Sequence, residues 1–453
     1  MRRLALTIAG VDFVLASLAL LVGHVLRFEG SCSAYNLVGP GGLRLLCFVL
    51  TALFSAYFCE MYRWKSRSGR VDLAARSAVS IMLAFFLLSA LYYLLPVAMV
   101  GRGVLSFSLL VFGTLQFLSH LGFSSLMESP AMALRVALVG VGPLAETTER
   151  LLQTHPSRQM LVGFIRPPAE PCTVGKEKVL GDVQHVTELV EQHRISRIIV
   201  AVTERRGSLP VRELLRCKLA GIEIIEALSF YEEMTGRLLV ENIQPSWFIY
   251  SNGFRITPFR RLYKRLFDLL FSLIGLAVAL PLFPFIALLV RFDSPGPIFF
   301  RQTRVGEREE LFTLIKFRTM RQDAEKETGA VWATENDPRI TRVGSFLRKS
   351  RLDELPQLFN VLVGSMSFVG PRPERPEFVD RLTQKIPYYA SRHSMKPGVT
   401  GWAQVCYPYG ACDEDALEKL RYDLYYIKNY SLILDFQIIL ETVKVVLFGR
   451  GGR

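Results

Sequence analysis

The sequence predicts a membrane protein of α/β class in three parts: a four-helix transmembrane bundle, a doubly wound α/β middle domain, and an α-rich C-terminal domain with a re-entrant membrane hairpin. Apolar residues make up 50% of the 453 residues and are concentrated before about residue 130 and again near 266–292. Such clustering is typical of membrane segments rather than of one soluble core. Between these blocks, short apolar runs alternate with amphipathic stretches, as in an α/β domain. A chain of this length has room for two or three domains.

The first part, residues 1–130, contains four hydrophobic segments. They lie near residues 4–26, 43–61, 77–100 and 104–127, and each is close to the ~20 residues that a membrane-spanning helix needs. The first segment is too long for a typical signal peptide and lacks a clear cleavage site. We therefore expect it to be retained as the first of four spans.

The basic residues between these segments predict their orientation. Arg2 and Arg3 precede the first span, and the connection between the second and third spans is rich in basic residues, whereas the other two connections are poorer. Basic connections stay on the cytoplasmic side. We expect the N-terminus and everything after residue 130 to be cytoplasmic. The basic residues of the rich connection are Arg63, Lys65, Arg67, Arg70 and Arg76.

The net charge of +13 suits an anionic membrane surface or phosphorylated substrates. The sequence carries no zinc-finger, homeodomain or RNA-binding signature, so we expect no nucleic acid partner. The seven cysteines are scattered and form no Cys-x-x-Cys pair. This pattern indicates reduced structural thiols rather than a disulfide framework or a zinc site.

The middle part, residues 131–245, begins with the run LRVALVGVGPLAE at 134–146. An apolar strand there leads into a G-x-G-x-x-A turn, Gly140–Ala145, at the start of a helix. The later runs LVGFI (161–165), ISRIIVAV (195–202) and GIEIIEAL (221–228) read as further strands. Strands that alternate with helices predict a parallel sheet, here a Rossmann-like domain of the CoA- or NAD-binding type.

The glycine turn leaves two interpretations of this domain open. Its backbone could approach a pyrophosphate at the helix N-terminus. A dinucleotide site usually also has an acidic residue after the second strand, and here that strand ends in Arg166-Pro167-Pro168. We therefore favour a structural or regulatory domain over a working NAD site.

A linker at 246–260 leads to a third hydrophobic block at 261–292. Pro281 and Pro284 lie at its centre, and basic residues flank both ends. A central proline removes a helical hydrogen bond and kinks the helix, and a simple span would favour basic residues on one side. We expect a re-entrant hairpin, whose freed backbone groups need partners inside the membrane. The alternative is a kinked fifth span, which would place the C-terminal part outside the cell.

The last part, residues 293–453, contains six compact motifs. In chain order they are DSPGPIFFRQTRVG (293–306), FTLIKFRTM (312–320), the acidic pair in SRLDELPQLF (350–359), GPRP (370–373), KPGVTGWAQV (396–405) and RYDLYYIKNYSLILD (421–435). Over roughly residues 258–450 this series closely resembles the bacterial sugar transferase family, the polyprenyl-phosphate hexose-1-phosphate transferases. One departure lies at the hairpin break, where many members have Ser-Pro and this chain has Leu280 before Pro281.

The four spans and the Rossmann-like domain resemble the long, three-part branch of that family, which starts exopolysaccharide, capsule or O-antigen assembly. The resemblance implies transfer of a hexose-1-phosphate from a UDP-sugar to undecaprenyl phosphate, with release of UMP. It places the enzyme in the bacterial inner membrane with its catalytic domain cytoplasmic, and it implies Mg²⁺ as cofactor and a possible homodimer. Glucose or galactose is the expected sugar. A re-entrant hairpin would set the site at the membrane boundary, where a soluble donor meets a lipid acceptor.

The acidic pair carries the expected chemistry. Asp353 resembles the nucleophile of the family, because a carboxylate can attack a phosphoryl group and hold it as an acyl phosphate. Glu354 is a metal ligand, a base or an exposed acid of the first helical turn. Both carboxylates are candidate Mg²⁺ ligands. Pro356 implies a helix that starts near Leu352 or Asp353, so we expect the helix dipole to lower the pKa of Asp353; an ordinary N-cap would occupy the same position.

Cations must offset the charge when one anion attacks another. Lys316, Arg318 and Arg372 are candidate phosphate contacts. Arg301 and Arg304 bind phosphate or lipid headgroups, or are simply solvated. Gly370, Pro371 and Pro373 are expected to shape a rigid turn around Arg372, and Pro281 marks the hairpin break. Trp402 and Gln404 are candidates for a nucleotide or sugar pocket. The alternative is that Trp402 is a core aromatic and Gln404 a surface polar group.

Other residues keep two interpretations. Asp423, Tyr425 and Tyr426 lie on an expected amphipathic helix, where packing competes with a site role. Asp268 caps the hairpin or pairs with a nearby arginine, or lies at the membrane interface. Two rival functions also remain. An NAD-dependent sugar dehydratase or epimerase would need a Tyr-x-x-x-Lys pair, which is absent from residues 203–260. A non-enzymatic scaffold would make the acidic pair dispensable.

Overall fold

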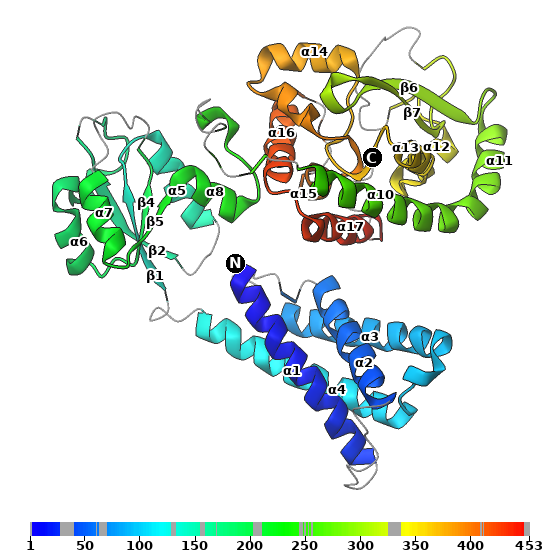
Figure 1. Ribbon diagram of the computed structural model, residues 1–453, viewed down its shortest axis with the longest axis horizontal. Coiled ribbons are helices and arrows are strands. Elements are labelled where there is room, and N and C mark those ends of the chain that lie inside the picture. Colours follow the sequence, from blue (N-terminus) through cyan, green and yellow to red (C-terminus); the bar gives the residue numbers. More distant parts are fainter. Residues whose placement is uncertain are drawn as a thin grey trace. The chain divides into compact units, whose positions relative to one another are not determined.

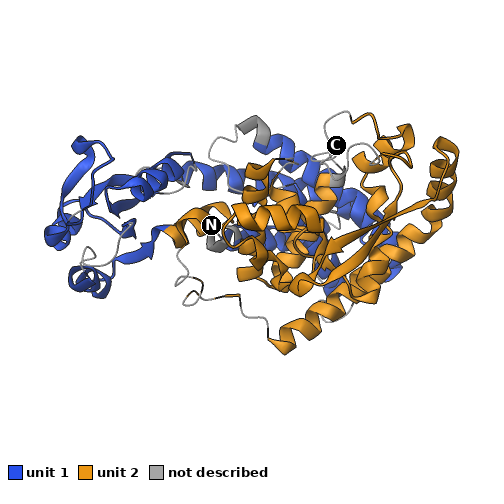
Figure 2. Ribbon diagram, turned by 90° about the horizontal axis from the view of Figure 1, so that it is seen from above, with its two compact units in different colours: residues 1–227 blue, residues 228–453 orange. Residues whose placement is uncertain are grey.

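The computed structural model divides the chain into two units, Met1–Ala227 and Leu228–Arg453 (Figure 2). The sequence places the end of the middle domain at residue 245, whereas the division into units falls after Ala227. The predicted domain boundaries remain predictions. The basic residues Arg63, Lys65 and Arg67 lie outside the described part of the chain. The structure describes residues 2–27, 40–59, 61–62, 70–127, 133–154, 159–168, 170–202, 211–243, 248, 251, 253–254, 257–324, 337–407, 410 and 412–447.

The first part of unit 1 consists of apolar helices. Four of them are long and apolar enough to cross a membrane, which confirms the four predicted segments as helices. Their shared core includes Leu20, Phe48, Leu88 and Phe112, all almost fully buried. The helices are α1 (Arg2–Arg27), α2 (Pro40–Phe58), α3 (Arg70–Leu94) and α4 (Arg102–Met127), with a short 3₁₀ turn η2 (Pro96–Ala98) before α4.

A polar cluster lies among these apolar helices. The carboxylate of Asp12, on α1, is fully buried and accepts hydrogen bonds from Gln116 Nε2 of α4 at 2.7 Å and from the Tyr62 hydroxyl at 3.0 Å. His120 Nε2, also on α4, lies 3.1 Å from the same oxygen. Because a buried charge needs partners in an apolar environment, this cluster fixes α1 against α4.

The middle part of unit 1 is a five-stranded parallel sheet of order β3-β2-β1-β4-β5. The chain extends the sheet in one direction from β1 and then in the other, which confirms the predicted doubly wound arrangement. Figure 1 shows α5 on one side of the sheet and α6 and α7 on the other. The elements are β1 (Leu134–Val139), α5 (Pro143–Thr154), β2 (Gln159–Arg166), η4 (Lys176–Lys178), β3 (Val179–Asp182), η5 (Val183–His185), α6 (Val186–Gln192), β4 (Arg197–Val200), α7 (Val211–Leu219) and β5 (Glu223–Glu226).

In the glycine turn of this domain, the side chain of Glu170 lies where a pyrophosphate would bind. Gly140 has a φ of +137°, and a Cβ there would lie 2.5 Å from Ala201 O, so only glycine fits. The next amide, Val141 N–H, donates to Glu170 Oε2 at 2.8 Å, and a Cβ on Gly142 would meet the same carboxylate at 2.7 Å. A pyrophosphate would compete with Glu170 for this position. The geometry thus favours the structural or regulatory interpretation of the domain.

Unit 2 is rich in helices and contains two small sheets, an antiparallel β6–β7 pair and a parallel β8–β9 pair. Its largest core packs α14, α16 and α17 around Leu382, Leu424 and Ile438. The elements are α8 (Ala227–Thr235), η6 (Val240–Asn242), α10 (Pro258–Ala279), η7 (Leu280–Leu282), α11 (Phe283–Asp293), β6 (Phe299–Val305), η8 (Glu307–Glu309), β7 (Leu311–Phe317), α12 (Arg342–Lys349), η9 (Leu352–Glu354), α13 (Gln357–Val363), β8 (Ser367–Val369), α14 (Pro376–Lys385), η10 (Tyr389–Ser394), β9 (Gly398–Thr400), α15 (Trp402–Cys406), α16 (Asp413–Lys428) and α17 (Leu432–Leu447).

The segment that follows the sheet is fastened to this unit. Lys428 Nζ lies 2.6 Å from Glu232 Oε2, and Asn429 Nδ2 donates to Glu232 Oε1 at 2.6 Å. The indole N–H of Trp402 donates to Gly236 O at 2.7 Å. Leu238 is buried in the main core. Residues 228–243 are therefore an integral part of the C-terminal fold.

The third hydrophobic block forms two helices that meet at a break. Residues Pro258–Asp293 form the fifth apolar stretch long enough to span a membrane, and α10 ends where the 3₁₀ turn η7, which contains Pro281, begins. Figure 1 shows the chain changing direction between α10 and α11. The guanidinium of Arg265 on α10 donates to Val361 O and Leu362 O of α13, at 2.6 and 2.7 Å. On the other arm, α11 packs against α12 through Val290. Both arms therefore contact other elements of unit 2, α10 contacting α13 and α11 contacting α12.

Candidate active site

The acidic pair lies in a short turn between two helices. Arg351, with a φ of +58°, is in the left-handed region and separates α12 from the 3₁₀ turn η9, which carries Asp353 and Glu354. Pro356 then caps α13. Helical backbone starts at Leu352, as Pro356 predicts, but the α-helix itself begins only at Gln357. Both carboxylates are buried, with 6% and 9% of their residue surface exposed.

The prediction that the pKa of Asp353 is lowered is wrong. Burial raises the pKa of Asp353 to about 6, and the neighbouring charge of Glu354 adds to the rise. Lys316, Arg348 and Arg372 oppose it only in part. A single 3₁₀ turn offers little dipole, whereas burial removes the hydration that stabilises a carboxylate in water. The loss of hydration outweighs the helix end.

Glu354 behaves in the opposite way. Arg372 Nη2 donates to Glu354 Oε1 at 2.6 Å, and Arg351 Nη1 lies 3.8 Å from the same oxygen. Burial disfavours the charged form, but these two guanidinium groups hold the pKa of Glu354 below its usual value. Two adjacent carboxylates with pKa values shifted apart are a common arrangement in active sites.

Cations surround the acidic pair. Burial lowers the pKa of Lys316 to about 8; Asp353 opposes this shift, while the positive charges of Arg304, Arg348 and Arg372 add to it. The Lys316 ammonium also lies 5.2 Å from the centre of the Phe300 ring. Four cations, Lys316, Arg304, Arg348 and Arg372, thus act on one another near the two carboxylates, and this balance of charge suits a multiply charged anion.

The G-P-R-P turn is held rigidly beside this cluster. A Cβ on Gly370 would lie 2.4 Å from Lys396 O, so glycine is required for the close approach. Just before the turn, Val369 O accepts from Lys264 Nζ at 3.0 Å and from the Tyr426 hydroxyl at 3.1 Å. Pro371 O accepts from a backbone N–H at 2.9 Å. Hydrogen bonds to Val369 O and Pro371 O thus hold the turn in place.

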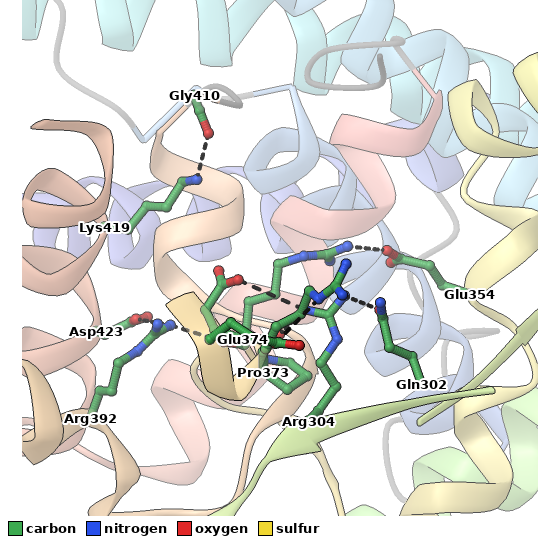
Figure 3. A network of polar contacts seen from close by, with 12 residues as sticks. Gln302, Arg304, Glu354, Pro373, Glu374, Arg392, Gly410, Lys419 and Asp423 are labelled. Atoms are coloured by element: carbon green, nitrogen blue, oxygen red, sulfur yellow. Dashed lines mark hydrogen bonds and ion pairs between the residues drawn. The ribbon is translucent and has the colours of Figure 1, made fainter. Parts of the chain in front are cut away.

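A buried ion pair supports Arg372 from behind. Arg392 Nη2 donates to Arg372 O at 2.9 Å and to Asp423 Oδ2 at 2.8 Å. Both side chains of this pair are almost fully buried. The network, which also joins Pro373 O to Arg304 Nη1 at 3.1 Å, is drawn in Figure 3. Asp423 therefore acts on the turn through Arg392.

The remaining predicted cations differ in position. Arg304 lies beside Gln302 Oε1, at 2.6 Å, within the network of Figure 3. Arg301, on the other face of β6, is exposed. The guanidinium of Arg318 donates to Ser294 O at 2.6 Å and to Pro295 O at 2.8 Å. These bonds hold the Ser-Pro-Gly-Pro turn and disfavour the predicted phosphate contact for Arg318.

The two predicted pocket residues also differ. Trp402 packs in the main core, with its ring stacked on Tyr425 at 6.1 Å between centres and its N–H bound to backbone. This environment favours the core interpretation of Trp402. Gln404 donates to Val399 O at 3.2 Å, and its buried Oε1 has no hydrogen-bond partner among the described residues. Gln404 and Glu354 line one cavity.

Sequence reasoning missed several residues of this site. Arg348 and Arg351 belong to the basic run RKSR, 348–351, directly before the acidic pair, and that proximity was an available signal. Arg392 had no such signal, because only the folded chain brings it to Arg372. Asp268 pairs with a lysine rather than with the expected arginine: Lys264 Nζ lies 3.3 Å from Asp268 Oδ1.

The acidic pair fits one mode of magnesium binding. In the described part of the chain, no group of three or more histidine, cysteine or carboxylate side chains is close enough to hold a metal ion. Magnesium is commonly bound by one or two carboxylates together with substrate phosphates and waters. Asp353 and Glu354 suit that mode and not an all-protein cage.

The fold and the site define a protein with apolar helices that could span a membrane and a buried carboxylate pair set among cations. Residues 259–449 match the family described as bacterial sugar transferase. The chain belongs to this family: it is 44% identical over 185 residues, 92% of that relative and 40% of this chain, to an exopolysaccharide production protein PSS of Rhizobium leguminosarum.

Two longer relatives cover more of the chain. A UDP-N-acetylgalactosamine-undecaprenyl-phosphate N-acetylgalactosaminephosphotransferase of Aeromonas hydrophila is 42% identical over 242 residues, 53% of this chain and 56% of that protein. A UDP-glucose:undecaprenyl-phosphate glucose-1-phosphate transferase of Xanthomonas campestris is 34% identical over 330 residues, 69% of this chain and 66% of that protein. The chain thus matches between about half and two thirds of the length of these two relatives.

Proposed function

We propose that the protein transfers a hexose-1-phosphate from a UDP-sugar to undecaprenyl phosphate and thereby starts the assembly of an exopolysaccharide, capsule or O-antigen. The observation that carries the proposal is the buried Asp353 beside Lys316, Arg348 and Arg372. A carboxylate among cations suits nucleophilic attack on a pyrophosphate. The relatives named for this reaction support the substrate classes.

The transfer proceeds in two displacements. A carboxylate oxygen of Asp353 attacks the phosphorus that bears the sugar; a new O–P bond forms, the bond to the bridging oxygen breaks, and UMP leaves with that electron pair. An oxygen of the lipid phosphate then attacks the same phosphorus, and Asp353 leaves as a free carboxylate. Atoms and charge balance in both steps.

The neighbouring residues lower the barrier to both displacements. Lys316, Arg348 and Arg372 offset the negative charge that builds up on the phosphoryl oxygens. Glu354, kept ionised by its guanidinium partners, orients Arg372 at 2.6 Å. A magnesium ion held by Asp353, Glu354 and the diphosphate would supply further charge neutralisation.

We further propose that α10 and α11 form a re-entrant hairpin and that α1–α4 form a transmembrane bundle. Contacts of both hairpin arms with the helices α12 and α13, through Val290 on one side and Arg265 on the other, support this topology, because a straight crossing would separate one arm from these helices. The catalytic domain is then cytoplasmic, at the bacterial inner membrane. A reporter fused after residue 135 tests on which side of the membrane this part of the chain lies. A reporter that is active only in the cytoplasm is expected to be active here, and activity of one that works only in the periplasm would contradict the topology.

The transfer is tested with purified protein, undecaprenyl phosphate, Mg²⁺ and a panel of radiolabelled UDP-sugars. The panel includes glucose, galactose and N-acetylgalactosamine donors. We expect one donor to label the lipid fraction, with release of UMP in equal amount. Gel filtration of the same sample tests the homodimer that the family resemblance implies.

The matched variants are Asp353→Asn and Asp380→Asn. Asp380 is an exposed aspartate on α14, so its variant is expected to keep full activity while Asp353→Asn loses transfer. An active Asp353→Asn enzyme would disprove the mechanism and favour a scaffold. A phosphosugar trapped on another residue would contradict the role of Asp353 alone and leave the transfer reaction intact.

A further inference from the structure

A cavity of about 230 Å³ lies beside the acidic pair. Most of its lining is apolar, and the charged residues among its lining are Arg351 and Glu354. Because the charged groups of these two residues lie 3.8 Å apart, the charge of the lining is confined to one place. The apolar lining residues are Gly275, Leu355, Leu358, Phe368, Val399, Val405 and Val445.

Two of the helices that line the cavity also carry exposed apolar side chains. Gly275 belongs to α10 within the hydrophobic hairpin, where Leu266 and Leu270 are more than half exposed. Val445 belongs to α17, on which Ile433 is 82% exposed and Phe436 47%. Exposed apolar faces of this kind mark contact with lipid or with another apolar partner. The cavity is therefore lined both by Glu354 of the acidic pair and by two helices with exposed apolar side chains.

We propose that this cavity binds the isoprene units next to the phosphate of the polyprenyl acceptor, with Arg351 as a contact for the acceptor phosphate. The inference rests on the proposed function and specifies how the acceptor binds. An apolar cavity of about 150 Å³ already takes up benzene, with its six carbons. The present volume is therefore sufficient for one or two five-carbon units.

The lining matches an isoprenoid chain better than it matches a nucleotide or a sugar. Each buried hydroxyl or amide of such a ligand needs a hydrogen-bond partner. Of the polar lining groups, Thr400 and Thr442 already share a hydrogen bond of 2.6 Å, and Gln404 Oε1 offers one acceptor. An isoprene unit makes no such demand.

Arg351, the proposed contact for the acceptor phosphate, has a left-handed backbone conformation. A non-glycine residue with a φ of +58° is strained, and Arg351 both lines the cavity and lies near Glu354. Such strain persists where the surrounding structure requires it. A lipid whose isoprene units lie in the cavity would have this guanidinium available for its phosphate.

The first experiment measures KM for prenyl phosphates of one, two and three isoprene units. Each buried methylene strengthens binding about fourfold, so KM of the natural enzyme is expected to fall at least about tenfold from one unit to two. Val445→Trp fills the cavity and is expected to abolish this fall, with KM for the UDP-sugar unchanged. Val443→Trp, on the exposed side of the same helix, is the matched control and keeps the fall.

Arg351→Gln distinguishes the binding contribution of the acceptor phosphate from that of the isoprene units. It is expected to raise KM for all three prenyl phosphates by a similar factor while the gain from one unit to two is retained. If Val445→Trp shows the same dependence on chain length as Val443→Trp, the cavity is not the isoprene site and the inference is overturned, although the transfer reaction stands.

A second readout does not depend on turnover. A prenyl phosphate with a diazirine on its first isoprene unit is photolysed with the full-length protein, and the labelled peptides are identified. Labelling within 352–363 or 432–447 that Val445→Trp removes supports the inference even if no sugar transfer is observed, in which case the proposed function alone fails. Labelling elsewhere overturns the inference. Labelling that excess phosphatidylglycerol suppresses as strongly as Val445→Trp does also overturns it.

Discussion

Replacement of Asp353 by asparagine is expected to stabilise the protein at neutral pH while it removes activity. Burial raises the pKa of Asp353 from its ordinary value of 3.8 to about 6 in the folded protein. The folded state therefore binds the proton more tightly than the unfolded state. As pH rises from below 4 to above 6, this group makes folding less favourable.

The size of the effect follows from the shift. A shift of about two pKa units corresponds to about 3 kcal/mol, since one unit is worth about 1.4 kcal/mol. At pH 7.5 the ionised Asp353 destabilises the fold by up to this amount, and asparagine carries no charge to be buried. For a domain of this size each kcal/mol moves the melting temperature by about 2–4 °C, so an increase of up to about 6–12 °C is expected.

The assay is thermal unfolding of the natural protein and of Asp353→Asn in the same detergent, between pH 4 and pH 8. The melting temperatures are expected to be similar near pH 4, to separate as pH rises from about 4 to about 6, and to keep a constant difference at higher pH. Asp380→Asn, a change at an exposed aspartate, should follow the natural protein throughout. If Asp353→Asn melts below the natural protein at pH 7.5, or if the difference is independent of pH, the reasoning about burial is refuted.

Three further expectations concern the cations and the metal. Lys316 loses its charge as pH rises through its pKa of about 8, so KM for the UDP-sugar should rise above pH 8, and Lys316→Arg should move that rise to higher pH; a profile unchanged by the variant would exclude Lys316 as a donor contact. Arg392→Leu leaves a buried carboxylate unpaired and should cost about 3–5 kcal/mol of stability in thermal unfolding. Arg381→Leu, at an exposed ion pair, should cost little, and similar losses for both would contradict the support assigned to Arg392. Chelation by EDTA should stop sugar transfer, and Mg²⁺ should restore it; full activity in EDTA would remove magnesium from the proposal.

Much of the architecture could be predicted from the sequence because it depends on local patterns. The length of the apolar runs determines the helices α1–α4, and the alternation of short apolar runs with amphipathic segments determines the parallel sheet. Pro281 marks the end of α10 for a local reason as well, since proline cannot donate the helical hydrogen bond. The helices and the proline break depend on short stretches of chain, and the sheet on a pattern repeated from residue 134 to residue 226.

The sequence motifs identify part of the candidate site, but not the pKa values of its charged groups. The motifs identified Asp353, Glu354, Lys316 and Arg372, and the structure brings these four together. The direction of the pKa shift at Asp353 depends on burial by distant segments, which no local pattern reports. The same cause explains Arg318, whose partners Ser294 and Pro295 were hidden in a turn some 20 residues away.

The attachment of residues 228–243 determines where this chain can be divided. A chimaera joined at residue 246, the boundary suggested by the sequence, would lose the acceptor of the Trp402 N–H and the partner of Lys428. It would also open the core at the place of Leu238. A junction just before Leu228 keeps all three, so the catalytic part and this preceding segment form one module for exchange between relatives.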